Sequence, residues 1–480
     1  MALVAGVDSS TQSCTIVLRD ADDGRMFGVA CSPHPPTTPL VSEQRPADWW
    51  AALQSAARQL DLRDVVAISV DGQGHGLVAL DDSYTVIRPT KLWNDTTSAP
   101  EAAELVRRLG PEVWAKRTGS VPTAAFTITK LLWLARHEPG NFARIAAIAL
   151  PADWIMFRLT GALRTDRSAA SGTGYFSPAD SAWLPDLLEL AGGEGWRPEL
   201  PVLVGPDEAA GSVSTAAGEA LGLPAGIPVG PGCNDQPPAA LSFGIRDGDV
   251  VISIGTSGTV FTRSSTPTAD ASGAVTGVAD ASGAFLPLVC TLNAAKVTDV
   301  FARILDIDHD ELARLALEAP ADADRPIVVP YLDGERTPNR PLARGTLAGF
   351  RSDLTRQQVA RAAFEGVVCG LLDGLDALER AGAPTDGRLI VTGGGARSAA
   401  YRQFLADLSG RPVYASDLSE AAAAGAAVQA AAVFHRLRVV DMATAWAPPL
   451  FIVAEPRPRQ NAEELRVRYQ RLASEERLDG

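Results

Sequence analysis

The chain has 480 residues, a length that suits two domains of roughly 200–250 residues each, and 46% of its residues are hydrophobic. Its formal net charge of −14 argues against nucleic acid or an anionic membrane as the main partner. No apolar stretch of about 18 residues occurs, no signal peptide is expected, and the five scattered cysteines suit a reducing compartment, so we expect a cytoplasmic protein.

The first half of the chain alternates short apolar runs with helical patterns. Residues 4–7 and 15–18 are apolar and flank a small polar turn, which predicts a hairpin. Residues 46–62 have helical spacing, and residues 65–70 form a buried-strand pattern. Residues 123–160 are mostly helical in pattern. This alternation predicts an α/β fold.

The second half begins with the same arrangement of strand, small polar turn and strand. Residues 250–254 are apolar and are followed by Gly255-Thr256-Ser257-Gly258-Thr259, after which the apolar pattern resumes. The repetition predicts a duplicated domain with a cleft between the two copies. Further helices are expected at residues 354–378, 399–408, 421–434 and 463–473, with a strand at residues 388–391.

Three turns could bind phosphate, because they offer backbone donors and small side chains. Asp8-Ser9-Ser10-Thr11 places a carboxylate beside three hydroxyls at a strand end. Gly255 to Thr259 has little side-chain bulk, and Gly393-Gly394-Gly395 lies between a strand and a helix. The sequence contains no P-loop motif, and each turn taken alone could be an ordinary tight turn.

Other polar residues suit a hydroxyl-rich ligand. Asp235 stands just before the expected boundary between the halves, where it could be a catalytic base or the N-cap of a helix. His75 lies in Asp71-Gly72-Gln73-Gly74-His75-Gly76, where it could bind a ligand or serve the core. The segment Trp93-Asn94-Asp95 adds an aromatic ring, an amide and a carboxylate, a combination that fits a polyol better than an apolar ligand.

Taken together, these motifs resemble the FGGY carbohydrate kinases, which belong to the actin-like, ribonuclease H-like ATPase superfamily. The resemblance covers roughly residues 3 to 440. Residues 8–13 resemble the first phosphate motif of the family, residues 255–259 the second, and residues 393–398 the adenosine motif. Tyr331-Leu332-Asp333-Gly334-Glu335-Arg336-Thr337-Pro338 is similar to a further family signature. The order and spacing of the four motifs carry the resemblance.

The resemblance implies two duplicated actin-like/ribonuclease H-like ATPase domains with an interdomain cleft. Residues 1–246 would bind the sugar and hold the first phosphate motif and the catalytic Asp. Residues 247–450 would bind ATP, and residues 451–480 would form a C-terminal tail helix.

The resemblance also implies roles for individual residues. Asp235 would be the general base, and Asp8 would lie beside the phosphates. Both would be close to Mg²⁺, partly through water. Substrate-binding residues would be Gly74, His75, Trp93, Asn94, Asp95 and Gln236. Residues that bind ATP would be Ser10, Thr11, Gln12, Gly255, Thr256, Ser257, Gly394, Gly395, Ala396 and Ser398.

The segments around His75, Asn94 and Ser168 are similar to those of family members that phosphorylate D-xylulose to D-xylulose 5-phosphate with ATP and Mg²⁺. Three positions depart from that pattern. Cys14-Thr15 stands where relatives usually have Lys or Arg. Gly74 stands where they often have Met or Gln, so we expect it to leave room beside the sugar. Asn234-Asp235-Gln236 replaces their usual Gly-Asp-Asn. The last two departures touch the choice of sugar.

Alternatives to xylulose remain open at this point. One is a kinase of the same family that acts on ribulose, a glycerol-like polyol or a rarer ketose. Another is a catalytically inactive regulator that binds sugar, and a third is an ATP-driven chaperone or filament. The resemblance suggests a homodimer, and neither nucleic acid nor a membrane is expected as a partner.

Overall fold

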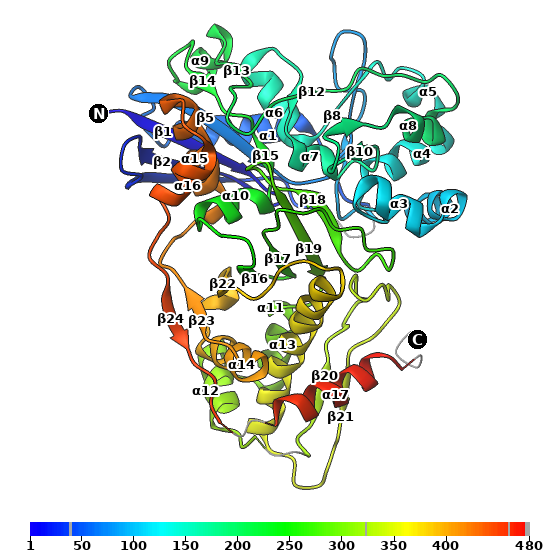
Figure 1. The fold of residues 1–480 in the computed structure, drawn as a ribbon, viewed down its shortest axis with the longest axis vertical. Coiled ribbons are helices and arrows are strands. Elements are labelled where there is room, and N and C mark those ends of the chain that lie inside the picture. Colours follow the sequence, from blue (N-terminus) through cyan, green and yellow to red (C-terminus); the bar gives the residue numbers. More distant parts are fainter. Residues whose placement is uncertain (38–40, 322–323, 459–460, 476–480) are drawn as a thin grey trace.

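The computed structural model describes residues 1–37, 41–321, 324–458 and 461–475. Two lobes are stacked along the long axis, and each is built on a mixed β-sheet with helices against it (Figure 1). The two α/β units predicted from the sequence are therefore present.

The sheet of the N-terminal lobe runs in the order β13-β14-β5-β1-β2-β3, and β15 also pairs with β5. Its strands are β1 (Leu3–Ser9), β2 (Ser13–Asp20), β3 (Met26–Pro33), β5 (Val65–Gly72), β13 (Gly211–Ser212), β14 (Pro228–Val229) and β15 (Cys233–Asn234). Small two-stranded sheets add β4 (Glu43–Gln44), β6 (Val78–Leu80), β7 (Thr90–Lys91), β8 (Ala147–Ala149), β9 (Arg164–Thr165), β10 (Phe176–Ser177), β11 (Ala182–Trp183) and β12 (Val202–Leu203).

The sheet of the C-terminal lobe runs in the order β18-β19-β17-β16-β22-β23-β24. Its strands are β16 (Val250–Ile254), β17 (Gly258–Thr262), β18 (Thr276–Ala279), β19 (Phe285–Thr291), β22 (Leu389–Thr392), β23 (Val413–Ala415) and β24 (Phe451–Ala454). A separate pair is formed by β20 (Ile327–Val329) and β21 (Thr346–Ala348).

Helices cover both sheets. In the first half they are α1 (Pro46–Ala57), α2 (Ala99–Leu109), α3 (Pro111–Thr118), α4 (Thr127–His137), α5 (Pro139–Phe142), α6 (Pro151–Thr160), α7 (Arg167–Ser171), α8 (Pro185–Gly192), α9 (Thr215–Leu221) and α10 (Gln236–Ser242). In the second half they are α11 (Ala295–Leu305), α12 (His309–Glu318), α13 (Arg356–Arg380), the 3₁₀ turn η1 (Gly394–Arg397), α14 (Ala399–Ser409), α15 (Ala421–His435), α16 (Val439–Ala445) and α17 (Ala462–Ala473).

The two sheets repeat one topology. Strand β1 is antiparallel to β2 and parallel to β5, and β16 is in the same way antiparallel to β17 and parallel to β22. Neighbouring parallel strands end at the same edge of a sheet, and ligands of α/β proteins bind at such edges. The repeat thus places the turn after β1 and the turn after β16 in equivalent positions in their lobes.

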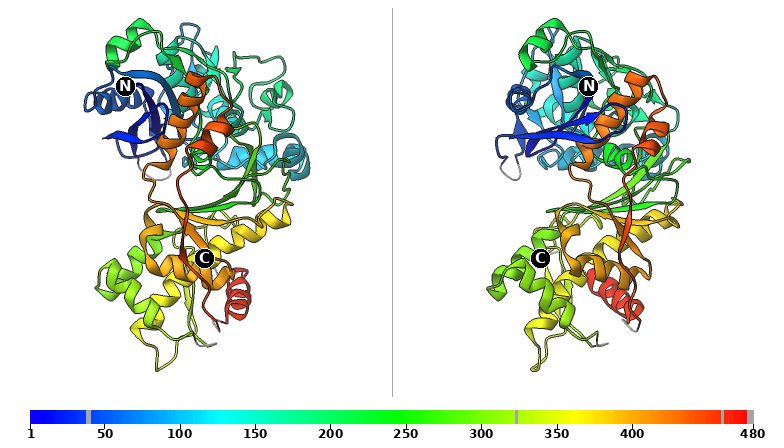
Figure 2. Two further views of the ribbon diagram at one scale, coloured as in Figure 1. Left: turned by 60° about the vertical axis from the view of Figure 1, so that its left-hand side comes forward. Right: turned by 90° about the vertical axis from the view of Figure 1, so that its left-hand side faces the viewer.

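Helix α15 comes late in the chain but packs on the N-terminal lobe. It lies against β1, β5 and α10, as both views in Figure 2 show. Ala427, Val428 and Ala431 share a buried cluster with Val4 and Ala67. The Ala-rich sequence allows this close approach, because small side chains let the backbone of the helix reach its neighbours.

The predicted boundary near residue 247 stays a prediction, and the packing crosses it through α15 and α16. Of the predicted tail, residues 459–460 and 476–480 lie outside the described residues. The described part contains strand β24 and helix α17, whose Leu465, Tyr469 and Ala473 belong to the core of the C-terminal lobe. Among the helices described, none has the length and apolar character needed to cross a membrane.

Candidate active site

Three aspartates meet at one edge of the N-terminal sheet. Asp8 lies near the end of β1 and is the register partner of Asp71 on the parallel strand β5. Strand β15 is also parallel to β5, pairing Cys233 with Asp71, and Asp235 follows directly after it. The shared direction of three strands therefore gathers carboxyl groups that are far apart in the sequence.

Burial makes these acids hard to ionise. Burial, with a smaller contribution from the charge of Asp235, raises the pKa of Asp8 from 3.8 to about 7, despite the lowering effect of the contact with Asp71. Burial and the neighbouring Asp8 raise the pKa of Asp71 well above its usual value. Asp8 Oδ1 and both carboxyl oxygens of Asp71 are buried without a donor from the rest of the described residues.

Such a pair of carboxyls fits a divalent cation, because hard cations prefer carboxylate oxygens and a bound cation would offset the cost of burying charge. Two acids and water would complete such a site. The described residues contain no group of three or more acidic, His or Cys side chains close enough to form a full protein ligand set.

Asp235 occupies the N-cap position of α10, but its side chain makes no capping hydrogen bond to the helix backbone that the structure describes. The interpretation of this residue as a simple cap is therefore not supported. Burial raises the pKa of its carboxyl from 3.8 to about 6, against the lowering effects of Gln236 and Arg336. Its own N–H donates to Asn234 Oδ1 at 2.7 Å, which fixes the backbone that carries the carboxyl.

The turn after β1 is hydrogen-bonded to the loops that carry Gly74, His75, Trp93 and Asn94, four of the residues predicted to bind sugar. These four residues are called the sugar cluster below. Thr11 Oγ1 donates to Gln73 Oε1 at 3.3 Å and accepts from Trp93 Nε1 at 2.9 Å. Gln44 Nε2 donates to the carbonyl of Thr11 at 3.0 Å, and Gln73 Nε2 donates to Gln44 Oε1 at 3.2 Å. Thr11 and Trp93, predicted to bind different ligands, thus contact one another and join the two predicted sites.

The neighbouring residues Ser10 and Gln12 lie in the same turn. Ser10 Oγ donates to the carbonyl of Ser13 at 3.1 Å, which closes the turn, while Gln12 is exposed. The following positions supply no cation, since Cys14 is buried and Thr15 Oγ1 points to Cys31 Sγ at 3.6 Å.

His75 is held in a strained backbone conformation, with φ of 65°. Its ring stacks on Phe126 with centroids 5.1 Å apart, and Thr127 Oγ1 donates to its carbonyl at 3.1 Å. Gly172 lies so close that an added Cβ there would be 1.7 Å from His75 Nδ1. Burial and the charges of Lys130 and Arg336 lower the pKa of the ring to about 3, so the imidazole is neutral at pH 7.

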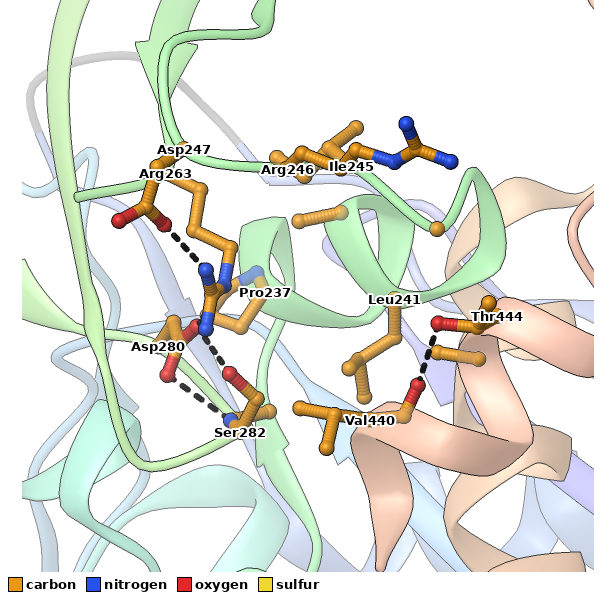
Figure 3. A pocket seen from close by; sticks show the side chains of 14 residues that line it. Pro237, Leu241, Ile245, Arg246, Asp247, Arg263, Asp280, Ser282, Val440 and Thr444 are labelled. Carbon is orange, nitrogen blue, oxygen red and sulfur yellow. Dashed lines mark hydrogen bonds and ion pairs between the residues drawn. The ribbon is translucent and has the colours of Figure 1, made fainter. Parts of the chain in front are cut away.

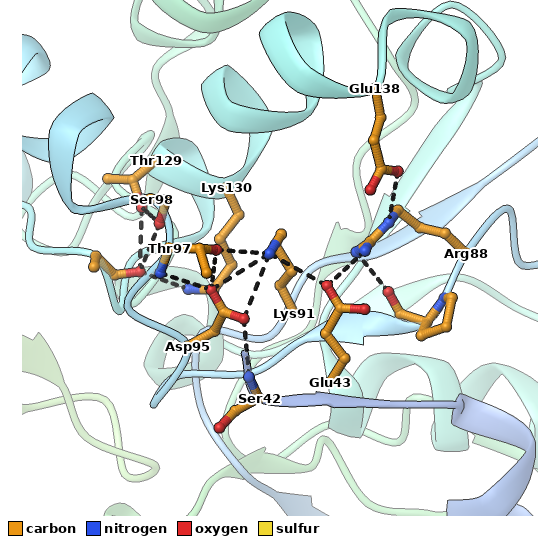
Figure 4. A network of polar contacts seen from close by, with 12 residues as sticks. Ser42, Glu43, Arg88, Lys91, Asp95, Thr97, Ser98, Thr129, Lys130 and Glu138 are labelled. Atoms are coloured by element: carbon orange, nitrogen blue, oxygen red, sulfur yellow. Dashed lines mark hydrogen bonds and ion pairs between the residues drawn. The ribbon is translucent and has the colours of Figure 1, made fainter. Parts of the chain in front are cut away.

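Asn94 and Asp95 are neighbours in very different surroundings. Asn94 Oδ1 is buried and has no partner among the described residues. The carboxylate of Asp95 is completely buried, and it accepts from Ser42 N, Thr97 N and Lys91 Nζ at 3.0–3.4 Å (Figure 4). The prediction that Asp95 binds substrate is therefore not supported, because protein donors already occupy both of its oxygens.

Figure 4 shows that this polar network continues to Glu43, Arg88 and Glu138. Lys91 Nζ also pairs with Glu43 at 3.2 Å, and Arg88 links Glu43 to Glu138 at 2.6 and 2.9 Å. We infer that the network holds the loop that carries Trp93 and Asn94 in place.

Gly74 leaves less room than expected. A Cβ added at Gly74 would be 2.6 Å from Asn234 Oδ1 and 2.9 Å from its Nδ2. The side chain of Asn234 thus fills the space beside Gly74, and Ser168 Oγ accepts from Asn234 N at 3.2 Å. The expectation of an enlarged pocket at Gly74 is corrected by this contact. Gln236 turns to the other lobe, where its Oε1 accepts from Thr259 at 3.3 Å.

The predicted ATP-binding residues of the second half of the chain lie at the equivalent edge of the C-terminal sheet. Thr256 is exposed at the turn after β16, and its carbonyl and that of Gly255 accept from Ala294 N and Ala295 N at 3.2 and 2.8 Å. The Gly-rich turn of residues 393–395 follows β22, which is the parallel neighbour of β16. Ser257 is the third predicted ATP-binding residue in the turn after β16. Its carbonyl accepts from Gly255 N at 3.0 Å.

The Gly-rich residues divide into packed and open positions. An added Cβ at Gly394 would meet nothing within 4 Å, whereas one at Gly395 would be 2.4 Å from Ile254 Cγ2. Ala396 is buried, and Ser398 Oγ is buried without a described partner. Gly394 is thus the position where a ligand can approach the backbone, while Gly395 allows η1 to pack on β16.

A separate cavity of about 210 Å³ lies between α10, α16 and the turn at Asp280 (Figure 3). It is lined by Pro237, Leu241 and Val440 on one side and by the ion pair of Arg263 and Asp247 on the other. Asp235 does not line it, so the cavity is distinct from the edge where the acids meet.

Two residues of the site were not assigned roles from the sequence. Asp71 lies near the end of a strand, as Asp8 does. This shared position was the sequence signal that could have identified Asp71 as a site residue. Arg336 lies inside the signature of residues 331–338, and its charge affects the pKa of both Asp235 and His75. Nothing in the local sequence shows that its loop reaches the other half of the chain.

Comparison with known proteins agrees with this geometry. The N-terminal domain model of the FGGY family of carbohydrate kinases matches residues 3–242, and the C-terminal domain model matches residues 250–434. The chain belongs to the FGGY family of carbohydrate kinases. The predicted family and its two-domain α/β fold are confirmed.

Individual FGGY relatives are similar over most of their length. The chain is 41% identical to a xylulose kinase of Streptomyces coelicolor, covering 92% of this chain and 90% of the relative. It is 42% identical to a xylulose kinase of Streptomyces rubiginosus over 89% and 87%. The crystal structure of xylulose kinase from Bifidobacterium adolescentis superposes with a TM-score of 0.85 at 38% identity, covering 97% of this chain and 98% of that one. As an FGGY kinase, the protein is an enzyme that uses ATP to phosphorylate a carbohydrate.

Proposed function

We propose that this FGGY kinase transfers the γ-phosphoryl group of ATP to D-xylulose, producing D-xylulose 5-phosphate, with Mg²⁺ as the metal. Family membership and relatives named xylulose kinase support this substrate. The observation that carries the proposal is the position of Asp235. It lies between Asn234, which contacts Gly74 of the sugar cluster, and Gln236, which contacts Thr259 beside the second phosphate turn.

Asp235 is the general base in this proposal. With a pKa of about 6, its carboxyl is mostly ionised at pH 7 and still basic enough to accept a proton. It takes the proton of the terminal hydroxyl at carbon 5 while that oxygen attacks the γ-phosphorus. A raised pKa near the working pH is typical of catalytic bases.

The sugar binds among His75, Trp93 and Asn94. Asn94 Oδ1 is a buried acceptor without a described partner, which suits a sugar hydroxyl donor. The neutral ring of His75 can donate or accept a hydrogen bond, and its stacking on Phe126 fixes its orientation. Asp95 holds their loop through Lys91 and Ser42 rather than binding the sugar.

The nucleotide binds along the C-terminal edge. Thr256 and Ser257 lie toward the phosphates, opposite Ser10, Thr11 and Gln12, and the open backbone at Gly394 receives the adenosine. Asp8 would hold Mg²⁺ together with Asp71, and with Asp235 partly through water. When bound, this ion neutralises charge on the phosphate oxygens. Each of these placements extends the family resemblance to a named residue of this chain.

A panel assay tests the substrate. ADP release is coupled to a spectroscopic readout for D-xylulose, ribulose, hexuloses, glycerol and other polyols, and each phosphate ester is identified by mass. We expect the highest kcat/KM with D-xylulose. A higher kcat/KM with another acceptor would replace xylulose as the substrate, and binding of sugar without ester formation would favour the regulator. The predicted homodimer and cytoplasmic location stay predictions.

A further inference from the structure

Arg336 of the C-terminal lobe carries a guanidinium that has no protein partner among the described residues. Arg336 is half-buried, and its backbone N–H donates to Glu335 Oε1 at 2.7 Å. In the part of the chain that the structure describes, its guanidinium forms neither a hydrogen bond nor an ion pair. Arginine side chains that are partly withdrawn from solvent are usually paired, so an unpaired one is a candidate to bind an anionic ligand.

The loop that carries Arg336 is fixed to the turn predicted to bind phosphate. Glu335 accepts from Leu292 N at 2.5 Å and from Asn293 Nδ2 at 2.8 Å, and Asn293 Nδ2 also donates to the carbonyl of Gly334 at 2.8 Å. Directly after these residues, Ala294 N and Ala295 N donate to the turn after β16. One connection, between β19 and α11, therefore sets the position of Arg336 relative to the phosphate turn.

Arg336 also lies near the base and the sugar cluster. Burial is the main influence on the pKa of Asp235, His75 and Lys130, which all belong to the N-terminal lobe, and the positive charge of Arg336 adds a smaller lowering effect on each. Because the interaction of charges weakens with distance, the guanidinium lies near these three residues. No ion pair joins Arg336 to Asp235 among the described residues, so the guanidinium remains available.

We propose that Arg336 binds the phosphoryl group as it passes from ATP to the sugar hydroxyl, and is therefore a further catalytic residue of this enzyme. The inference rests on the proposed kinase reaction at Asp235. In that reaction the bond from the sugar oxygen to the γ-phosphorus forms, the hydroxyl proton goes to Asp235, and the bond to the bridging oxygen breaks. ADP leaves with that electron pair.

The chemistry of the group favours the phosphoryl oxygens over the sugar. A guanidinium donates two parallel N–H groups, which match two oxygens of a phosphoryl group, and its charge offsets the negative charge spread over them. A ketose is neutral, so its hydroxyls would leave the charge of a half-buried arginine uncompensated.

Substitution of Arg336 tests the role. Arg336→Met and Arg336→Lys are compared with Arg344→Met, which removes an exposed arginine of the same loop whose guanidinium binds the carbonyls of Leu342 and Ala343. For each variant we measure kcat, KM for both substrates, the sugar Kd without nucleotide, and the thermal unfolding midpoint. We expect Arg336→Met to lower kcat at least about 100-fold with the sugar Kd within about threefold. Arg336→Lys should recover part of the loss, and Arg344→Met should behave as wild type.

Two results would overturn the proposal. One is a kcat close to wild type with a sugar Kd raised in proportion to KM, which would make Arg336 a sugar-binding residue. The other is an equal loss in Arg344→Met, which would mean that the loop is merely structural. The acceptor used is whichever sugar the wild-type enzyme phosphorylates fastest, so a wrong assignment of xylulose does not affect the comparison. If Arg336→Met unfolds early, Arg336→Gln takes its place.

Discussion

At the scale of single residues, Gly74 and Asn234 form one unit. The amide of Asn234 fills the space where a side chain at position 74 would lie, and its Oδ1 also accepts from Asp235 N. The wall of the sugar pocket and the support of the base thus come from the same side chain. We infer that the residues at positions 74 and 234 depend on one another.

The contact between Gly74 and Asn234 predicts that the effects of substitutions at these two positions on kcat/KM are not additive. Gly74→Met should force Asn234 to move, disturb Asp235 and lower kcat/KM for the sugar about 10–100-fold, whereas Gly74→Met with Asn234→Gly should regain much of the activity. The check is a double-mutant cycle on kcat/KM for D-xylulose and ribulose. Losses that simply add in the double variant would show that the two positions act independently.

Single residues also show what the sequence could and could not predict. Asp8 was predictable because it stands where an apolar run stops, and Asp235 because it stands just before the expected boundary between the halves. The hydrogen bonds that occupy the carboxylate of Asp95 were not predictable, because its donors Ser42 and Thr97 are brought to it only by the folded structure. The same holds for Thr11 and Trp93, which are distant in sequence and hydrogen-bonded in space.

At the scale of elements, apolar periodicity predicted the central strands of both sheets and several of the longer helices. The expected helix at residues 421–434 is α15, and the expected strand at residues 250–254 is β16. The placement of α15 on the opposite lobe was not predictable, since an all-round apolar, Ala-rich helix carries no sign of which surface it covers. Gly6 and Gly425 are the positions that make this contact possible.

Packing of α15 gives a stability prediction. An added Cβ at Gly425 would be 1.8 Å from the carbonyl oxygen of Pro238, and one at Gly6 would be 1.9 Å from that of Ala423. Gly425→Ala and Gly6→Ala should each destabilise the protein by about 1–3 kcal/mol or more, because backbone must shift. Thermal and urea unfolding measure this.

Gly140→Ala is the matched control, since nothing lies within 4 Å of the added Cβ. Its stability should stay within about 1 kcal/mol of wild type. Equal stability of all three variants would mean that α15 does not pack as tightly as described.

At the scale of the whole molecule, the proposed reaction is divided between the two lobes. In this proposal the N-terminal lobe supplies Asp8, Asp71, Asp235 and the sugar cluster, and the C-terminal lobe supplies the phosphate turn after β16 and the guanidinium of Arg336. The contact between Gln236 and Thr259 joins them beside the base. We propose that both lobes must meet for transfer, so Asp235 should serve the chemistry and not the fold.

The most direct measurement is therefore phosphate-ester formation from D-xylulose and ATP by Asp235→Asn, followed by ³¹P NMR, with unfolding measured in parallel. Asp64→Asn, an exposed site, is the control. We predict that Asp235→Asn loses at least about 100-fold in rate while its unfolding midpoint stays equal or rises, because a buried carboxylate with a raised pKa costs stability at pH 7. A rate close to wild type in Asp235→Asn would contradict the assignment of the base.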